Sequence, residues 1–141
     1  MKRLVFDPEA CILCESCVLA CSLAHEGAVS LSRSRIVVTE AIHLHGTMAH
    51  VCRQCKDTPC VQSCPVDALI QDKGTGAISV NRERCVACGA CETACPFGGI
   101  RIDQKRRDVL VCDLCSGDPR CVQVCIPGAL SFSDKGNIPC K

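Results

Sequence analysis

The run CVACGACETACPF at residues 85–97 places four cysteines in the spacing C-x2-C-x2-C-x3-C and follows the last of them with proline. Three more groups share its opening C-x2-C and its closing C-x3-C, so that sixteen of the seventeen cysteines in 141 residues fall into groups of four. Repeated sets of thiols at these spacings indicate metal ligation. In chain order the groups are Cys11, Cys14, Cys17 and Cys21; Cys52, Cys55, Cys60 and Cys64; Cys85, Cys88, Cys91 and Cys95; and Cys112, Cys115, Cys121 and Cys125.

Each group supplies the four thiolates that a 4Fe-4S cube needs at its iron corners. This spacing lets one loop reach three corners while the fourth cysteine points away. In bacterial two-cluster ferredoxins the fourth cysteine binds the other cluster. Groups one and three have the full ferredoxin spacing, and Pro65 and Pro96 follow the last cysteines of groups two and three. The sequence therefore predicts four 4Fe-4S clusters, with no ligand missing.

Three other uses of cysteine explain less of the pattern. Structural zinc needs only two C-x2-C pairs, and it leaves the closely spaced third cysteine and the trailing prolines unexplained. A disulfide framework needs an oxidising compartment, but too few apolar residues follow the start of the chain for a secretory signal. Radical S-adenosylmethionine chemistry would need C-x3-C-x2-C, which the sequence lacks.

Composition agrees with a protein whose interior is partly cofactor. Aromatic residues make up only 2% of the chain, which has no Trp or Tyr. Such a core is thin for one domain of this length, so we expect folding to depend on cluster insertion. No run approaches the roughly 18 apolar residues of a membrane-spanning helix. We therefore expect a cytoplasmic protein without a membrane span.

The charge of the chain depends on the cofactors. The formal net charge is +1, but each oxidised cluster with its thiolates carries about −2, so the loaded protein should carry roughly −7. A nucleic-acid partner is therefore not expected. The basic run Lys105, Arg106 and Arg107 is interpreted first as a solvated face, with a docking patch or a charge that tunes nearby clusters as the alternatives.

The segments around the cysteines indicate how the groups pair. Residues 64–70, 95–102 and 125–132 repeat one element, a turn through Pro or Gly that leads into a short apolar stretch. The turn at 73–76 leads into 77–80, which we expect to be a hairpin strand. Groups two and three then form an inner unit, and groups one and four form an outer one.

The rule that the last cysteine of each group crosses to the paired group gives the ligand sets. Cluster A takes Cys11, Cys14, Cys17 and Cys125; cluster B takes Cys52, Cys55, Cys60 and Cys95; cluster C takes Cys64, Cys85, Cys88 and Cys91; and cluster D takes Cys21, Cys112, Cys115 and Cys121.

The expected fold is α+β, with two nested bacterial-ferredoxin-like units made of short strands, short helices and many cluster-binding loops. Residues 1–141 form a single domain, with the inner unit at about 50–103 and the outer unit at about 1–30 plus 108–135. Because Ser22 rather than proline follows Cys21, we expect a helix over 15–25 that continues past this cysteine.

Some residues receive no cluster role. The residues available to pack from the expected helix are Val18, Leu19, Leu23 and Ala24. A strand is expected at 35–39, and His43, His45 and His50 near its end are interpreted as exposed loop histidines rather than as a metal site. Cys140 is interpreted as a spare thiol.

The nested order of the groups, with the second group at 52–60 and the fourth at 112–121, resembles the iron–sulfur subunit of the dimethyl sulfoxide reductase family. That family includes electron-transfer subunits of formate dehydrogenases, polyferredoxins linked to hydrogenases and carbon monoxide dehydrogenases, and small subunits of tungsten aldehyde oxidoreductases. The resemblance implies a large catalytic redox subunit as partner, with a tungsten or molybdenum enzyme favoured, and a further electron-carrier subunit or ferredoxin.

The implied function is electron transfer without catalysis. Each cluster would change oxidation state without changing ligands, and the sequence shows no Ser/His/Asp set, phosphate loop or G-x-G-x-x-G run. No catalytic residues are therefore assigned. A dedicated subunit of an oxidoreductase complex is the first hypothesis, a freely diffusing polyferredoxin that serves several enzymes is the alternative, and a cluster-sensing regulator is the third.

Overall fold

Short elements separated by cysteine loops make up the chain. The computed structural model describes residues 1–43 and 45–134, and Cys140 lies outside these ranges. The mixture of short helices and short strands is the predicted α+β class. In chain order the elements are β1 (Arg3–Phe6), α1 (Ser16–Glu26), η1 (Leu31–Arg33), β2 (Val37–Ala41), β3 (Gly46–His50), α2 (Pro59–Gln62), β4 (Leu69–Gln71), β5 (Ile78–Val80), α3 (Ala90–Ala94), β6 (Ile100–Asp103), β7 (Asp108–Val111), η2 (Leu114–Gly117), α4 (Arg120–Gln123) and β8 (Leu130–Ser133).

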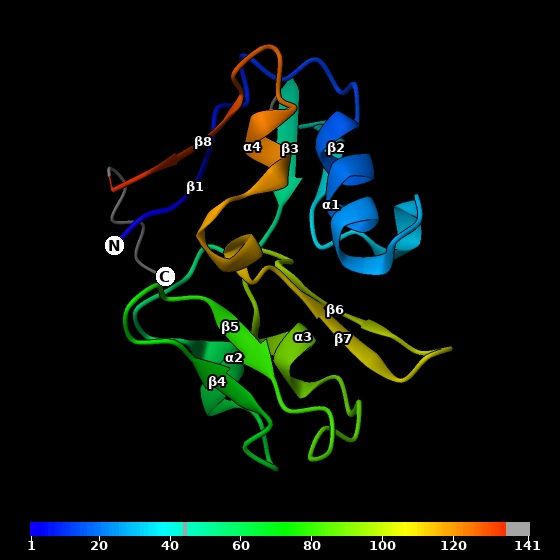
Figure 1. Cartoon of the computed structure of the whole chain (residues 1–141), viewed down its shortest axis with the longest axis vertical. Helices are drawn as coiled ribbons and strands as arrows, with labels where there is room; N and C mark the ends of the chain where they lie inside the picture. Colours follow the sequence, from blue (N-terminus) through cyan, green and yellow to red (C-terminus); the bar gives the residue numbers. More distant parts are fainter. Residues whose placement is uncertain (44, 135–141) are drawn as a thin grey trace.

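The strands pair in a nested order. Within the described ranges they form two-stranded antiparallel sheets, and β1 pairs with β8, the first strand with the last, with Leu4 opposite Phe132. Inside this frame β4 pairs with β5, and β6 pairs with β7. The hairpin expected from the turn at 73–76 is therefore present. Because β1 pairs with β8, the cysteine groups that follow β1 and precede β8 lie in one half of the molecule (Figure 1).

The helices repeat this pairing. α1, which carries Cys17 and Cys21, packs against α4, which carries Cys121. α2, which carries Cys60, packs against α3, which carries Cys91. The two pairs occupy opposite halves of the molecule (Figure 1). Group one is thus adjacent to group four, and group two is adjacent to group three.

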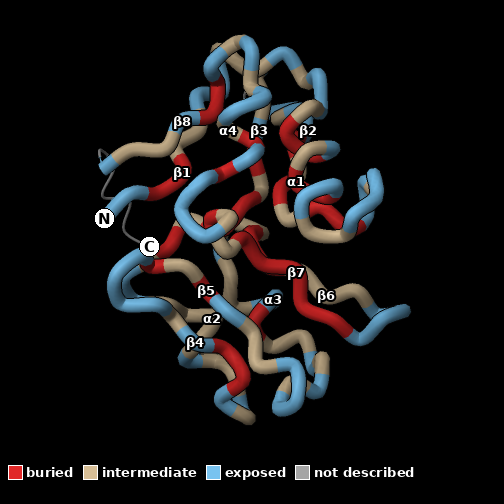
Figure 2. Tube along the Cα trace, in the orientation of Figure 1, coloured by how far each residue is buried: buried red, intermediate tan, exposed pale blue. Residues whose placement is uncertain are grey.

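Aliphatic side chains of strands and of neighbouring segments form the interior between these halves. Ile36, Ile78, Ile100 and Leu114 are among the most deeply buried side chains. All four residues of β7 are buried, and this strand runs through the middle of the molecule (Figure 2). The core therefore lies between the two pairs of cysteine-bearing helices.

The structure corrects the expected packing of α1. The helix continues past Cys21 to Glu26, as predicted. Val18 is buried, but Leu19, Leu23 and Ala24 are exposed. The reason is that Cys17, Val18 and Cys21 occupy the covered side of the helix, so the remaining aliphatic residues face outward.

The segment between groups one and two contains a hairpin that the sequence showed only in part. The strand expected at 35–39 begins at Val37 and pairs with β3, with Val38 opposite Ala49. His43 and His45 are exposed outside the strands, but His50 belongs to β3 and its Nε2 lies 3.3 Å from the hydroxyl of Thr39. The interpretation of His50 as a loop residue was therefore wrong.

The turn after group three packs tightly onto the loop of group two. A Cβ atom at Gly99 would lie 2.6 Å from the backbone nitrogen of Cys52 and 2.6 Å from the carbonyl carbon of Val51. Only glycine permits this approach. Gly99 therefore fixes the distance between two of the inner cysteine loops.

Candidate metal centres

Every cysteine group bends its chain at the same position. The residue before the second cysteine has a positive φ angle in all four groups: 56° at Leu13, 46° at Gln54, 53° at Ala87 and 60° at Leu114. Residues with side chains rarely adopt this conformation, and such strain is concentrated at functional sites. Four different side chains share one strained bend, which indicates that the loops wrap around the same kind of object.

The last cysteine of every group accepts a backbone hydrogen bond on its sulfur. Each donor is an N–H group 3.3–3.4 Å from the Sγ atom, and such donors favour the thiolate that iron requires. In groups two to four the donor lies four or five residues after the cysteine, whereas in group one, where the helix continues, the donor comes from the segment after η1. The pairs are Arg35 to Cys21, Ala68 to Cys64, Gly99 to Cys95, and Leu130 to Cys125.

The thiols of the outer half gather across the group boundary. Burial raises the pKa of the Cys17 thiol to about 11, and the charges of Cys11, Cys125 and Cys14 add to this rise. Together with Cys17, these three neighbours are the predicted ligands of cluster A. Burial also raises the pKa of Cys121 to about 12, with Cys21 as its strongest charged neighbour. Crowded, buried thiols stay protonated unless a cation joins them, so the donor set suits an iron cluster.

The thiols of the inner half behave in the same way. Burial raises the pKa of Cys52 to about 12, and Cys60 and Cys95 add to the rise. These three cysteines also line one cavity between α2 and the turn after α3. Burial raises the pKa of Cys91 to about 11, with Cys60 and Cys85 as charged neighbours. The cysteine neighbours here come from both groups of the inner unit.

The spacing of the thiols is too wide for single zinc ions. Among the residues that the structure describes, only His25, Asp113 and Cys115 place three potential ligand atoms within 4.8 Å of one another. Tetrahedral zinc with Zn–S bonds of about 2.3 Å would hold its sulfurs roughly 3.8 Å apart. The cysteine groups therefore fit a larger inorganic core better than a single ion.

Cys55 stands apart from the other predicted ligands. It lines the cavity of Cys52, Cys60 and Cys95, but it is disulfide-bonded in this structure. A disulfide sulfur has no thiolate to offer iron. Assembly of cluster B with this cysteine would require its prior reduction.

His25 is a functional candidate that the sequence reasoning missed. It lies one helical turn after Cys21 in α1, and its Nδ1 is 2.9 Å from the carbonyl oxygen and 3.8 Å from the sulfur of that cysteine. Its Nε2 lies 3.0 Å from the carboxylate of Asp113. Asp113, then Cys115 and Cys21, raise the pKa of His25 to about 12 despite partial burial. A cationic imidazolium therefore lies between two predicted ligands of cluster D. The i, i+4 spacing from Cys21 was the available signal.

Two of the cysteines that the structure describes are exposed. Cys14 of group one and Cys88 of group three are the exposed members among the described cysteines assigned as free. Cys14 belongs to predicted cluster A and Cys88 to predicted cluster C. Each predicted cluster also has at least one buried cysteine: Cys17 in A, Cys52 in B, Cys91 in C, and Cys21, Cys112 and Cys121 in D. The outermost thiols therefore belong to two different sites.

Similarity to known proteins agrees with these observations. Residues 44–135 match the 4Fe-4S dicluster domain family. The chain is 44% identical over 122 residues to the polyferredoxin-like subunit of aliphatic sulfonate oxidoreductase from Pyrococcus furiosus, covering 86% of this chain and 70% of that protein. It is 31% identical over 162 residues to the electron transport protein HydN of Escherichia coli, covering 97% and 90%.

Two further likenesses concern parts of larger systems. The β subunit of NADH-dependent phenylglyoxylate dehydrogenase from Aromatoleum evansii is 37% identical over 139 residues; the match covers 97% of this chain but only 31% of that subunit. A chain of the active-site complex BamBC of benzoyl coenzyme A reductase superimposes with a TM-score of 0.56 at 22% identity, covering 94% of this chain and 79% of that one. At that identity the likeness shows the fold alone. Among the described residues, no helix is long and apolar enough to cross a membrane.

Proposed function

The chain belongs to the 4Fe-4S dicluster family, and we propose that it relays single electrons through four 4Fe-4S clusters. By their names, two relatives are subunits of an oxidoreductase and of a dehydrogenase and a third is an electron transport protein, which supports the role of an electron-transfer subunit. The proposed ligand sets are A to D as the crossing rule gives them. The observation that carries the proposal is the backbone hydrogen bond to the sulfur of the last cysteine in each group. In all four groups this bond favours the thiolate form of the cysteine that is proposed to bind the paired cluster.

The contacts between groups suggest the order of the relay. Cys60 of the proposed cluster B is a charged neighbour of Cys91 in C. Cys52 of cluster B is in turn a neighbour of buried Cys112 in D. Cys17 of cluster A is a neighbour of Cys121 in D. These contacts support a line of clusters in the order C, B, D and A.

The exposed thiols then mark the ends of the relay. Cys88 lies at the C end and Cys14 at the A end, while none of the described thiols of the middle clusters is exposed. Electrons would enter at one end and leave at the other. The bound clusters supply the one-electron chemistry, and this chain sets their potentials through hydrogen bonds, charge and burial.

A large catalytic subunit is proposed to cover the A end. Two aliphatic side chains there are open to solvent: Ile126 is 95% exposed beside Cys125, and Ile12 is 68% exposed beside Cys11. Apolar side chains in the centre of an interface are typical of lasting complexes. This exposure supports a dedicated subunit over a freely diffusing polyferredoxin. A tungsten or molybdenum enzyme is the favoured partner, on the strength of the motif resemblance.

Anaerobic analysis of iron and acid-labile sulfide tests the cluster count. The expected values are about sixteen of each per chain, since each cube holds four of each. A value of about twelve would mean that the chain holds three clusters and that one proposed site is not a cluster site. Native purification tests the partner: the expected result is a complex with a large subunit that contains tungsten or molybdenum by elemental analysis. A monomer in every preparation would contradict the dedicated-subunit proposal.

A further inference from the structure

Arginines gather on the loop of the proposed cluster C. Arg82, Arg106 and Arg107 line a surface hollow together with Cys85. The Nη2 of Arg107 donates a hydrogen bond of 3.1 Å to the carbonyl of Val86, which lies between the first two cysteines of that group. The basic run that the sequence showed at 105–107 is therefore folded back against this end of the relay.

The carboxylates that face these arginines lie beneath them and are already shared. Asp108 is 8% exposed and accepts hydrogen bonds from Arg33 at 2.8 Å and from Arg82. Glu26 accepts from Arg33 at 3.0 Å and from Arg106 at 3.3 Å. Both carboxylates also form an ion pair with buried Arg33, so they only partly neutralise the charges of Arg82 and Arg106.

Other cations of this surface are unpaired. Arg84 and Arg107 are exposed, and no carboxylate in the described part of the chain lies within 4.0 Å of their charged nitrogens. Glu83 is the one acid in the loop between β5 and Cys85, and it is flanked by Arg82 and Arg84. The outward charge next to Cys85 and Cys88 is therefore positive.

The two ends of the relay thus differ in surface chemistry. The A end presents exposed Ile12 and Ile126, which suits a lasting apolar interface. The C end presents arginines around one apolar side chain, Val86, which is 49% exposed. Charged surfaces with a small apolar centre accelerate association without holding the partner long. That combination suits a partner that must dock, exchange an electron and leave.

We propose that the basic surface of Arg82, Arg84, Arg106 and Arg107 docks a small acidic one-electron carrier protein over Cys88. This inference rests on the proposed relay. In the exchange, the carrier is oxidised by one electron and cluster C is reduced by one, or the reverse, and no bond is made or broken. The acidic partner is specified by charge complementarity, since the loaded chain is anionic overall and would otherwise repel it.

Stopped-flow reduction of the loaded full-length chain tests this docking site. The probes are a reduced acidic two-cluster ferredoxin and, for comparison, reduced methyl viologen, a small donor that needs no protein docking surface. Electrostatic steering changes association rates by about 10- to 1,000-fold. We expect the variant Arg84→Glu with Arg107→Glu to slow reduction by the ferredoxin at least about tenfold at low ionic strength, and to leave the viologen rate and the iron content unchanged.

Controls separate this proposal from its alternatives. Lys2→Glu, an exposed charge reversal at the residue before β1, should leave the ferredoxin rate within about twofold. Added salt should slow the wild type and leave the double variant nearly unaffected. Equal slowing with both donors would assign the arginines to tuning of cluster C and overturn the docking site, as would an unaffected ferredoxin rate. A stronger inhibition by phosphate than by chloride at equal ionic strength would assign the surface to small anions instead. If neither donor reduces any cluster, the relay itself is refuted.

Discussion

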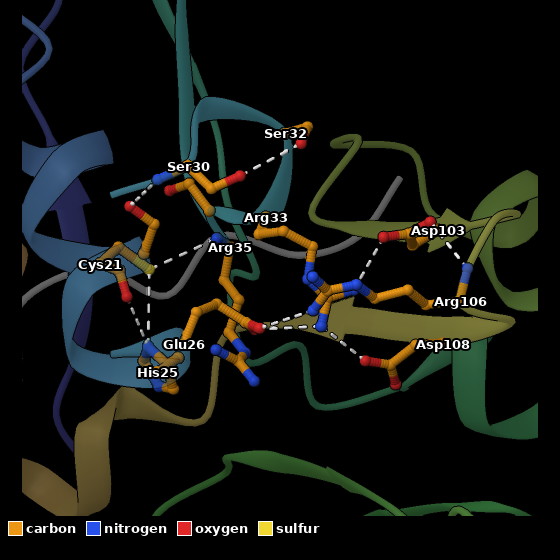
Figure 3. A network of polar contacts seen from close by, with 12 residues as sticks. Cys21, His25, Glu26, Ser30, Ser32, Arg33, Arg35, Asp103, Arg106 and Asp108 are labelled. Carbon is orange, nitrogen blue, oxygen red and sulfur yellow. Dashed lines mark hydrogen bonds and ion pairs between the residues drawn. The ribbon is translucent and has the colours of Figure 1, made fainter. Parts of the chain in front are cut away.

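The guanidinium of Arg33 lies 2.8 Å from the carboxylate of Asp108, although 75 positions separate the two residues. Arg33 is only 6% exposed, and it also reaches Asp103 at 2.9 Å and Glu26 at 3.0 Å (Figure 3). Asp103 and Asp108 belong to β6 and β7, while Glu26 ends α1. One buried cation therefore ties the helix of group one to the hairpin between groups three and four.

Removal of this cation should destabilise the loaded protein. Arg33→Met leaves buried Asp108 and half-buried Glu26 and Asp103 without their shared partner, and breaking a buried ion pair costs about 3–5 kcal/mol. The expected fall in the anaerobic thermal midpoint is on the order of 10 °C for a chain of this length. Arg106→Met, which removes an exposed partner of Glu26, should cost about 0–1 kcal/mol. If both variants lost the same stability, the burial of Arg33 would not add to the strength of its ion pairs.

The same network predicts how acid acts. Arg33 and Arg82 outweigh burial and hold the pKa of Asp108 below its usual value of 3.8, and the pKa of Asp103 is lowered as well. A lowered carboxyl pKa gives stability that is present above the ordinary pKa and is lost as the pH falls through the lowered one. The difference in thermal midpoint between wild type and Arg33→Met should stay constant from about pH 8 to 5 and narrow below about pH 4. A gap that widens in acid would contradict the lowered pKa values.

The crossing of the fourth cysteines predicts which cluster a single substitution affects. Cys21→Ala should alter the electron paramagnetic resonance signal of the cluster held by Cys112, Cys115 and Cys121. Cys125→Ala is the matched variant and should alter the cluster held with Cys17. If Cys21→Ala disturbs only the cluster of its own group, the ligand sets are wrong.

Gly99 predicts an effect of packing on cluster B. Gly99→Ala would place a methyl group 2.6 Å from the backbone nitrogen of Cys52, and backbone shifts of this kind cost about 1–3 kcal/mol. We expect faster loss of one cluster in the presence of an iron chelator. Gly74→Ala, where the nearest atom is a carboxylate oxygen of Asp72 at 3.4 Å, is the control and should behave like wild type. If both variants lost the cluster at the same rate, the close approach of Gly99 to Cys52 would not be what stabilises cluster B.

Much of this organisation is readable from the sequence because cysteine spacing is local information. Group spacing, the helix through Cys21 and the hairpin before group three each depend on neighbouring residues. The β2–β3 hairpin was seen only in part, because residues 46–50 lack the apolar alternation that marks a strand. Arg33 and its acids could not be paired from the sequence, since nothing local links positions so far apart. The hydrogen bond from the Arg35 N–H to Cys21 could not be predicted for the same reason. In the other groups the donor follows the last cysteine closely, but in group one the helix continues and the donor comes from a later segment.

His25 predicts a specific change in potential at cluster D. Its imidazolium lies between Cys21 and Cys115 and is held in place by Asp113 at 3.0 Å (Figure 3 shows its contacts with Cys21). A cation beside cluster thiolates favours the reduced, more negative state. His25→Leu should therefore lower the midpoint potential of one cluster, and a shift of about 59 mV corresponds to a tenfold change in the one-electron equilibrium.

A redox titration followed by electron paramagnetic resonance measures this shift cluster by cluster. His25→Lys keeps a positive charge at the site and should restore part of the lost potential, which a purely structural role for the ring would not explain. Asp113→Asn removes the main support for the protonated imidazole but also a negative charge near the cluster, so the two effects oppose each other and its shift should be smaller than that of His25→Leu. An unchanged potential in His25→Leu with full iron content would show that the histidine only caps the helix. A shift in all clusters at once would point to a change in the fold rather than to a local effect of charge.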